Sequence, residues 1–494
     1  MDEHPADCAC PGPTRRGFLA DGGMGFVGLA LGAMLHRDGL ARADPVHGWG
    51  PPDGKPHFPP RAKRVIWLMM RGGVSHLESF DPKPELTKHA GKTIGESPHN
   101  EAVFGSRYLK NVREQVANNI IDKTKGKIYP TQIGFQKGGQ SGIEVSDWWP
   151  HVRGCVDDLA VVRSMYTTDN NHGAQMEFFT GRHLLDGCFP TIGSWVHYGL
   201  GALSDDLPQF ISMGPPLEYQ CMGATDANYL GPENAGVMLK VDPADPLPFA
   251  RPGVPLGTTE GAMKADLLGR LNRLSALEYP SDPALRARIK SYELAFRMQT
   301  AVPEVLRFAD EGEATRRLYG LDNDVTRPFG QQMLAARRLA ERGVRFIQVF
   351  HGEGAAGAWD AHSGLKANHT SLCAQVDKPI AGLLVDLKAR GMLDDTVVVW
   401  ATEFGRTPCA QGADGRDHHN YGFSIWMAGG GIKGGVVHGA TDELGFHAVE
   451  HRHYVTDVHA TVLHLLGLDS HRLEIPGRKR LEVEHGTPIR AILA

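Results

Sequence analysis

Histidines, carboxylates and hydroxyls gather in this chain directly after its most apolar segments. They form four groups: Arg71, Ser75, His76 and Asp81; Thr167, Thr168, Asn170, Asn171 and His172; His351, Asp360 and His362; and Glu403, Arg406, Asp417, His418 and His419. Imidazoles and carboxylates together suit zinc, manganese or iron, whereas sites built from oxygen alone suit calcium or magnesium. The pattern indicates metal-assisted chemistry at a site assembled from distant parts of the chain.

The predicted metal ligands come from the last two groups. They are Asp360, His362, Glu403, Asp417, His418 and His419. The strongest signal is the run of three potential ligands at 417–419 in a Gly-rich loop, for which the alternative is a solvated loop. For the pair at 360 and 362, the alternative is a turn residue beside a surface histidine. The carboxylate at 403 follows an apolar run, where it is costly unless it is paired or bound to a cation.

Two residues of the second group have more ordinary interpretations. The Thr168 hydroxyl needs a base or a metal before it can act as a nucleophile. His172 could simply belong to the first turn of a helix in which Asn171 is the N-cap. A further histidine cluster is interpreted as surface or supporting residues: His447, His451 and His453.

Five apolar runs are the predicted strands that position these groups. They cover residues 64–70, 158–165, 344–350, 396–400 and 423–428. Helical spacing of apolar residues occurs between and after them, at 171–182, 191–200, 369–390 and 455–466. This alternation predicts an α/β fold, an α/β/α sandwich around a mostly parallel sheet. Ligands of such sheets bind at the carboxyl ends of the strands, where the four groups are expected to lie.

The N-terminal region predicts export. Thr14-Arg15-Arg16-Gly17-Phe18-Leu19 precedes a weakly apolar run and an Ala41-Arg42-Ala43 end, which is typical of a twin-arginine signal peptide over residues 1–43. That route carries folded proteins, so the twin-arginine export machinery is an expected partner and the location is periplasmic or secreted. The alternatives are a chance Arg-Arg before an ordinary signal peptide and an uncleaved anchor. The apolar run at 22–35 argues against the anchor, because it is shorter than the about 20 residues that span a bilayer.

The rest of the chain reads as one domain. Residues 44–62 form a linker, and 63–494 a single domain with a loop-rich insertion around 203–260. The net charge of −5 over 494 residues gives no electrostatic footprint for nucleic acid, and no later run predicts a membrane span. One or two disulfides remain open among the cysteines beyond the signal: Cys155, Cys188, Cys221, Cys373 and Cys409.

Several segments together resemble one exported bacterial family, called domain of unknown function 1501. They are 72–84, Asn170-Asn-His-Gly173 with Thr180-Gly-Arg182, Asp360-Ala-His-Ser363, Glu403-Phe-Gly-Arg-Thr-Pro408, Gly415-Arg-Asp-His-His419 and 428–435. Members are often labelled sulfatases because they are similar to the alkaline phosphatase superfamily. The resemblance implies an α/β/α fold with one or two metal ions, and a Thr, Ser or modified Cys nucleophile.

The resemblance also implies roles for individual residues. Thr168 is the nearest match to the nucleophile, and Asp360 with His362 resembles the Asp and His of one metal site. Glu403 lies where a metal-binding Asp follows a strand, and His418 or His419 resembles the later His of the first site. Asp417 joins these predicted ligands, and His172 is the second predicted catalytic residue.

Three departures from the superfamily pattern change the expected site. Arg71 stands where the first strand usually ends in a metal-binding Asp, Glu403-Phe404 replaces an Asp-His pair, and Cys-x-Pro-x-Arg is absent. One metal with Arg71 and Arg406 is the alternative to two metals, because arginine binds oxyanions through two parallel hydrogen bonds. Asn171 is the third predicted substrate-binding residue.

The expected function is that of an exported metal-dependent hydrolase of sulfate or phosphate esters. Its cofactor is one or two divalent ions, zinc, manganese or calcium, and its substrate an anionic ester, with carbohydrate esters included. One alternative is a non-catalytic periplasmic binding or partner protein that retains a degenerate hydrolase fold. Another alternative is a phosphonate- or phosphomutase-type enzyme. A test for group transfer rather than hydrolysis would distinguish it.

Overall fold

The computed structural model describes most of the chain after its N-terminal region. The described residues are 52–110, 124–204, 206–219, 222–242, 258–279, 283–478 and 482–494. They belong to one structural unit, Pro52–Ala494. The predicted signal peptide and residues 44–51 of the predicted linker lie outside the described residues.

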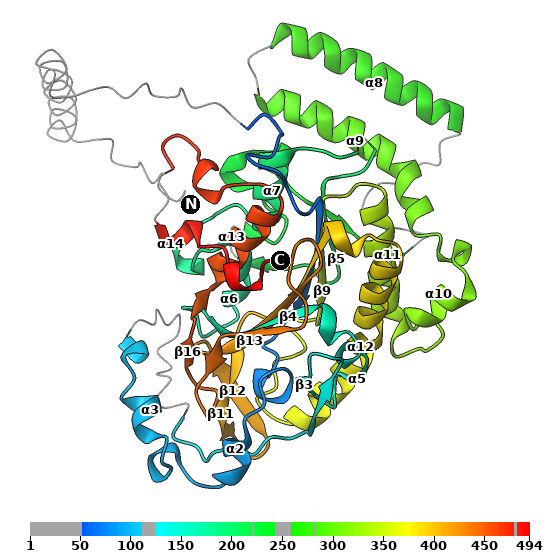
Figure 1. The fold of residues 1–494 in the computed structure, drawn as a ribbon. Helices are drawn as coiled ribbons and strands as arrows, with labels where there is room; N and C mark the ends of the chain where they lie inside the picture. The colour runs from blue at the N-terminus through cyan, green and yellow to red at the C-terminus, as the bar shows by residue number, and fades with distance from the viewer. Residues whose placement is uncertain are drawn as a thin grey trace, which may run out of the picture. The chain divides into compact units, whose positions relative to one another are not determined.

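A nine-stranded sheet lies at the centre (Figure 1). Its order is β14-β4-β13-β10-β1-β9-β5-β8, and β17 pairs with β4. All pairs are parallel except those that β13 makes with β10 and β4. The strands are β1 Arg64–Met70, β4 Leu159–Tyr166, β5 Phe210–Met213, β8 Val237–Leu239, β9 Phe346–His351, β10 Thr396–Ala401, β13 Phe423–Ala428, β14 Val436–His438 and β17 His453–Tyr454. The five predicted strands and the mostly parallel sheet are confirmed.

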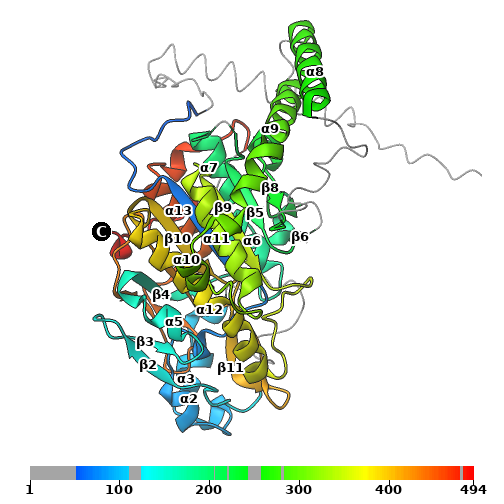
Figure 2. The ribbon, with the colours of Figure 1, turned by 90° about the vertical axis from the view of Figure 1, so that its right-hand side faces the viewer.

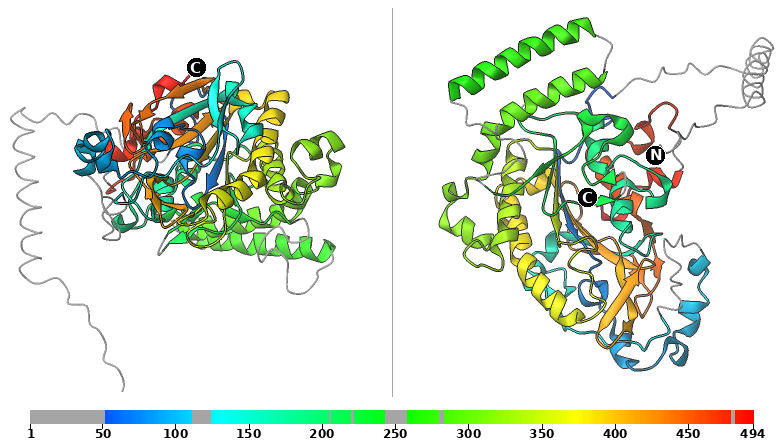
Figure 3. Two further views of the ribbon diagram at one scale, coloured as in Figure 1. Left: turned by 90° about the horizontal axis from the view of Figure 1, so that it is seen from below. Right: turned by 180° about the vertical axis from the view of Figure 1, so that it is seen from behind.

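Helices cover both faces of the sheet, as Figures 2 and 3 show. One face carries α5 Pro150–Arg153, α11 Arg327–Glu341 and α12 Leu365–Ala389. The other carries α6 Ala174–Thr180, α7 Ile192–Leu200 and α13 Val455–Leu465.

Strand β1 shows why the sheet needs a layer of helices on each face. Ile66, Leu68 and Met70 point into one apolar core and Val65, Trp67 and Met69 into the other, all fully buried. Successive strand residues face opposite sides, so a continuous apolar run can be satisfied only between two layers.

The structure differs from the expected insertion around 203–260. Within the described residues of that range, β5 and β8 extend the central sheet beyond β9. These strands have four and three residues, and the Gly and Pro residues around them hide so short a signal in the sequence. Residues 243–257 lie outside the described residues.

A β-hairpin forms where the sequence suggested a Gly-rich loop around 417–419. Its strands are β11 Gly405–Gln411 and β12 Gly415–His419, which pair Arg406 with His418. The β12 side chains are polar yet buried, so no apolar pattern marks this strand.

The remaining elements surround this framework. They are α2 Pro84–Lys88, α3 Asn100–Phe104, β2 Phe135–Gly138, β3 Ile143–Ser146, β6 Glu218–Tyr219, β7 Met222–Gly223, α8 Thr258–Glu278, α9 Pro283–Val305, α10 Glu313–Leu318, β15 Ala440–Thr441, β16 Ala448–Glu450 and α14 Glu482–His485. Across the described ranges, no helix is both long enough and apolar enough to cross a bilayer.

Candidate metal centre

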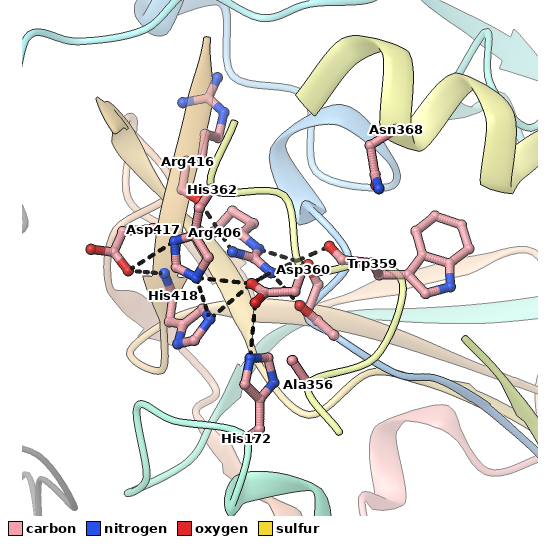
Figure 4. A network of polar contacts seen from close by, with 12 residues as sticks. His172, Ala356, Trp359, Asp360, His362, Asn368, Arg406, Arg416, Asp417 and His418 are labelled. Atoms are coloured by element: carbon pink, nitrogen blue, oxygen red, sulfur yellow. Dashed lines mark hydrogen bonds and ion pairs between the residues drawn. The ribbon is translucent and has the colours of Figure 1, made fainter. Parts of the chain in front are cut away.

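Three histidines from different parts of the chain turn the same ring nitrogen toward one carboxylate (Figure 4). Nε2 of His362 and Nε2 of His418 lie 2.9 and 3.0 Å from Asp360 Oδ1. Nε2 of His172 lies 3.2 Å from Asp360 Oδ2. Asp360 and His362 belong to the loop after β9, His172 to the loop after β4, and His418 to β12.

The other ring nitrogen of each histidine faces an acceptor. Nδ1 of His172 lies 3.2 Å from Glu403 Oε1, and Nδ1 of His418 lies 3.0 Å from the Asn170 carbonyl oxygen. Nδ1 of His362 contacts the amide oxygen of Gln411. These oxygens only accept hydrogen bonds, so each Nδ1 carries the proton and each Nε2 of a neutral ring presents a lone pair.

This arrangement fits a bound cation. The Nε2 atoms of His362 and His418 are 3.0 Å apart, where two lone pairs beside a carboxylate would repel one another. The buried Nε2 of His172 makes no hydrogen bond within the described residues. Histidine ligands commonly donate their second nitrogen to a carboxylate or a backbone carbonyl, as His172 and His418 do here.

The potential ligand atoms fall into two overlapping sets. His172, Asp360 and His418 have ligand atoms within 4.8 Å of one another, and so do His362, Asp417 and His418. Because the sets share His418, the site is a single cluster. The His362 side chain is 38% exposed and that of Asp360 18%, so the cluster opens to solvent beside His362.

The surroundings shift the pKa values of the cluster's residues in different directions. Burial acts to raise the pKa of Asp360, but contacts with the three histidines and the charge of Arg406 keep that pKa far below its usual range. Burial lowers the pKa of His418, so this ring is neutral. Burial opposes protonation of His172, but its contacts with Asp360 and Glu403 outweigh this and raise its pKa.

Arg406 fixes the carboxylate from behind. This fully buried guanidinium donates from Nη2 to Asp360 Oδ1 at 2.8 Å and from Nε to the Gly73 carbonyl at 2.8 Å. It also donates to the carbonyls of Gly72, Trp359 and Arg416. Position 72 requires glycine for two reasons. Its φ is +120°, and a Cβ there would lie 2.5 Å from the Asp360 amide nitrogen.

Glu403 and Arg71 belong to a buried network around Gln175, a residue that the sequence did not single out. Glu403 accepts from the Gly72 amide at 2.8 Å and from Gln175 Nε2 at 3.1 Å. Arg71 donates from Nε to Gln175 Oε1 at 2.9 Å, and also to the carbonyls of Pro216 and Gly354. The sequence did offer one signal for Gln175, because this polar residue stands between the apolar residues Ala174 and Met176 in a predicted helix.

Thr168 and Asn171 lie in the loop that carries His172. Thr168 Oγ1 donates to the buried Glu177 Oε1 at 2.6 Å. Asn171 Oδ1 accepts from the His172 amide at 2.7 Å, although α6 begins only at Ala174 and its N-cap is Gly173. The helix therefore starts later than the sequence suggested, and His172 precedes it.

The run at 417–419 divides because it forms a strand. His418 faces Asp360, whereas His419 contacts the Phe446 carbonyl on the opposite side of β12. Asp417 Oδ1 lies 3.7 Å from His362 Nδ1 and accepts from the His418 amide at 2.8 Å. The structure thus brings together Asp360, His362, His418 and His172, with Asp417 at the margin and Glu403 behind His172.

A family model described as "Protein of unknown function (DUF1501)" matches residues 62–493. The chain belongs to this family. The comparison with curated proteins finds no match.

The chain is also similar to solved structures. The phosphonate monoester hydrolase SpPMH from Silicibacter pomeroyi is 14% identical over 70% of this chain and 71% of its own, with a TM-score of 0.34. The lipoteichoic acid synthase LtaP from Listeria monocytogenes is 11% identical over 89% and 80%, with a TM-score of 0.33. The PsFucS1 sulfatase from Pseudoalteromonas sp. is 11% identical over 83% and 68%, with a TM-score of 0.31. At these scores the function has to be argued from the side chains.

Proposed function

We propose that this protein is an exported metal-dependent hydrolase of sulfate or phosphate esters. The observation that carries the proposal is the set of three Nε2 atoms directed at Asp360, each with its Nδ1 engaged by an acceptor. His172, Asp360 and His418 would hold one divalent ion, with His362 completing the set on the solvent side. Zinc and manganese suit this mixture of imidazole and carboxylate.

The chain's own residues prepare this site. Glu403 orients the His172 ring, the Asn170 carbonyl orients His418, and Arg406 positions Asp360. Arg71 and Arg406 have protein acceptors, so in this proposal they act by positioning the loops after β1 and β9. A bound divalent ion would supply Lewis-acid polarisation of the ester and a lowered pKa for an oxygen nucleophile.

Thr168 is the proposed nucleophile, because its hydroxyl already has a proton acceptor. Thr168 Oγ1 donates to Glu177 Oε1 at 2.6 Å, the relation that a nucleophile and its base require. In the proposed step the hydroxyl proton passes to Glu177 as the oxygen bonds to phosphorus or sulfur. The ester oxygen then leaves with its electron pair and takes a proton from water, which becomes hydroxide. A second water attacks the same phosphorus or sulfur and gives a proton to that hydroxide, the bond to Thr168 Oγ1 breaks, and Oγ1 takes back the proton from Glu177.

The test combines metal content with hydrolysis of 4-nitrophenyl phosphate and 4-nitrophenyl sulfate. Wild type, Asp360→Asn, His418→Gln and the control His464→Gln are purified without chelators. We expect about one divalent ion per chain and ester hydrolysis in wild type and control, and loss of both in the other two variants. Bound metal without hydrolysis would favour the non-catalytic alternative. Full metal retention in Asp360→Asn and His418→Gln would defeat the ligand assignment.

A second comparison addresses the nucleophile. Thr168→Ala should keep the metal and lower kcat by about 100-fold or more. Activity close to wild type in this variant would assign the attack to water instead. Product capture by an added alcohol would reveal transfer rather than hydrolysis.

A further inference from the structure

A second cluster of histidines and a carboxylate lies in the segment that contains α2 and α3, outside the candidate metal centre. Nε2 of His89 and Nε2 of His99 each lie 3.1 Å from the same oxygen, Glu85 Oε2. The three ligand atoms lie within 4.8 Å of one another. His89 follows Glu85 by four residues at the end of α2, and His99 is the N-cap of α3.

The cluster is partly shielded from solvent. The side chains of His89, His99 and Glu85 are 9%, 14% and 25% exposed, and the two rings meet edge to face with centroids 5.3 Å apart. Two imidazoles that converge on one oxygen of a single carboxylate leave that oxygen crowded. Lys88 Nζ donates to the other oxygen, Oε1, at 2.9 Å and to Oε2 at 3.2 Å.

We propose that Glu85, His89 and His99 bind a divalent ion of the zinc type. Two imidazole nitrogens and one carboxylate oxygen are a usual ligand set for zinc, with a water in the fourth position. Zinc–ligand bonds of about 2.1 Å in a tetrahedron place neighbouring ligand atoms about 3.4 Å apart. The two distances of 3.1 Å from a histidine Nε2 to Glu85 Oε2 therefore need only a small adjustment. Lys88 would then hydrogen-bond the free oxygen of the ligating carboxylate, an arrangement common around metal ligands.

The location gives this ion a structural role. Helices α2 and α3 have five residues each, and helices so short are not stable by themselves in water. A small apolar cluster lies beneath them, including Leu86, Ile94 and Val103. An ion that joins α2 to the start of α3 would close a short loop and stabilise a segment with little core of its own.

The segment also supports the candidate metal centre indirectly. Thr93 pairs with Lys127, and Ile128 pairs with Cys409 of β11. The hairpin of β11 and β12 carries Arg406 and His418. Through these pairs, residues 84–104 support the strands that position both side chains. The ion would stabilise this support without touching the candidate metal centre, and the inference does not depend on the proposed hydrolase activity.

The test uses the full mature chain with His172→Gln and His418→Gln already in place, so that the candidate metal centre contributes no zinc. Glu85→Gln and His99→Gln are added singly, with His464→Gln as a matched control. Zinc is measured by mass spectrometry after dialysis, and amide hydrogen exchange is followed over 84–104 with and without zinc. Circular dichroism verifies that each variant is folded.

We expect about one zinc ion per chain in the parent and in the control, and none in Glu85→Gln or His99→Gln. Zinc should slow exchange over 84–104 in the parent and the control only. Lys88→Ala should still bind zinc, since it removes no ligand. Equal zinc binding by Glu85→Gln, His99→Gln and the parent would overturn the site. Zinc binding that leaves exchange over 84–104 unchanged would overturn the structural role.

Discussion

At the scale of single residues, the geometry of the candidate metal centre depends on side chains that are not themselves proposed ligands. Arg406 forms a fork of hydrogen bonds to Asp360 and to the carbonyls of Gly72 and Gly73. Lysine keeps the charge but has one compact ammonium group and cannot reproduce the fork. The positioning of Asp360 therefore depends on the shape of the guanidinium as well as on its charge.

Arg406→Lys should accordingly weaken metal binding by about 10- to 100-fold and lower the free energy of unfolding by about 1–3 kcal/mol. Metal titration and thermal unfolding measure the two effects. Arg342→Lys is the matched control, because this arginine is 38% exposed and its contacts with Glu304 and the Ala301 carbonyl lie at the surface. An Arg406→Lys protein with unchanged metal affinity would mean that Asp360 is held by its loop alone.

Asp169 is a residue whose burial should make stability depend on pH. Burial raises its pKa to about 7, and its Oδ2 has no hydrogen-bond partner within the described residues. A carboxyl whose pKa is raised on folding stabilises the fold below its unfolded pKa of about 4, and this contribution disappears as pH rises to about 7. At pH 8 the buried carboxylate therefore opposes folding.

In the wild type, the Asn171 amide donates to Asp169 Oδ1 at 2.9 Å. Asp169→Asn removes the titration and keeps an oxygen that can accept this hydrogen bond. The variant should be more stable than wild type at pH 8, by at most about 4 kcal/mol, and gain little at pH 4. Denaturant unfolding at both pH values measures this. An equal gain at pH 4 and pH 8 would show that charge is not the cause.

At the scale of elements, β12 decides which of two adjacent histidines reaches the centre. His418 faces Asp360 and His419 faces the Phe446 carbonyl, because successive strand residues point to opposite sides. His418→Gln should abolish metal retention. His419→Gln should retain the metal and lower only the melting temperature, since it removes a buried hydrogen bond. Metal analysis and thermal unfolding of the pair test the register, and the reverse result would contradict it.

The sequence predicted the elements whose signals are local. Strand β1 and helix α12 were found because apolar residues repeat along them, and Asp360, His362 and His418 were proposed because their types suit a metal. Strand β12 was missed because its buried residues are polar and satisfied by distant partners, as Arg416 is by Glu78. The contact of the Asn170 carbonyl with His418 spans 248 positions, and no local pattern records it.

At the scale of the whole molecule, the cysteines bear on the compartment. Cys188 is disulfide-bonded, while Cys155, Cys373 and Cys409 are buried free thiols. Burial raises the pKa of Cys155 to about 11 and that of Cys409 to about 12, so these thiols are unreactive. Disulfides persist in oxidising compartments, which agrees with the proposed export.

The proposed twin-arginine signal can be tested through this difference in cysteine chemistry. Arg15→Lys with Arg16→Lys should block export and leave the protein in the cytoplasm, where thiols are kept reduced. Cys188 should then be modified by a thiol reagent after denaturation, whereas in the exported wild type it should be protected until a reductant is added. Fractionation and mass spectrometry of the labelled peptides report location and redox state together. Unchanged export of the double variant would exclude the twin-arginine route, and a reduced Cys188 in exported protein would remove the disulfide from the argument for an oxidising compartment.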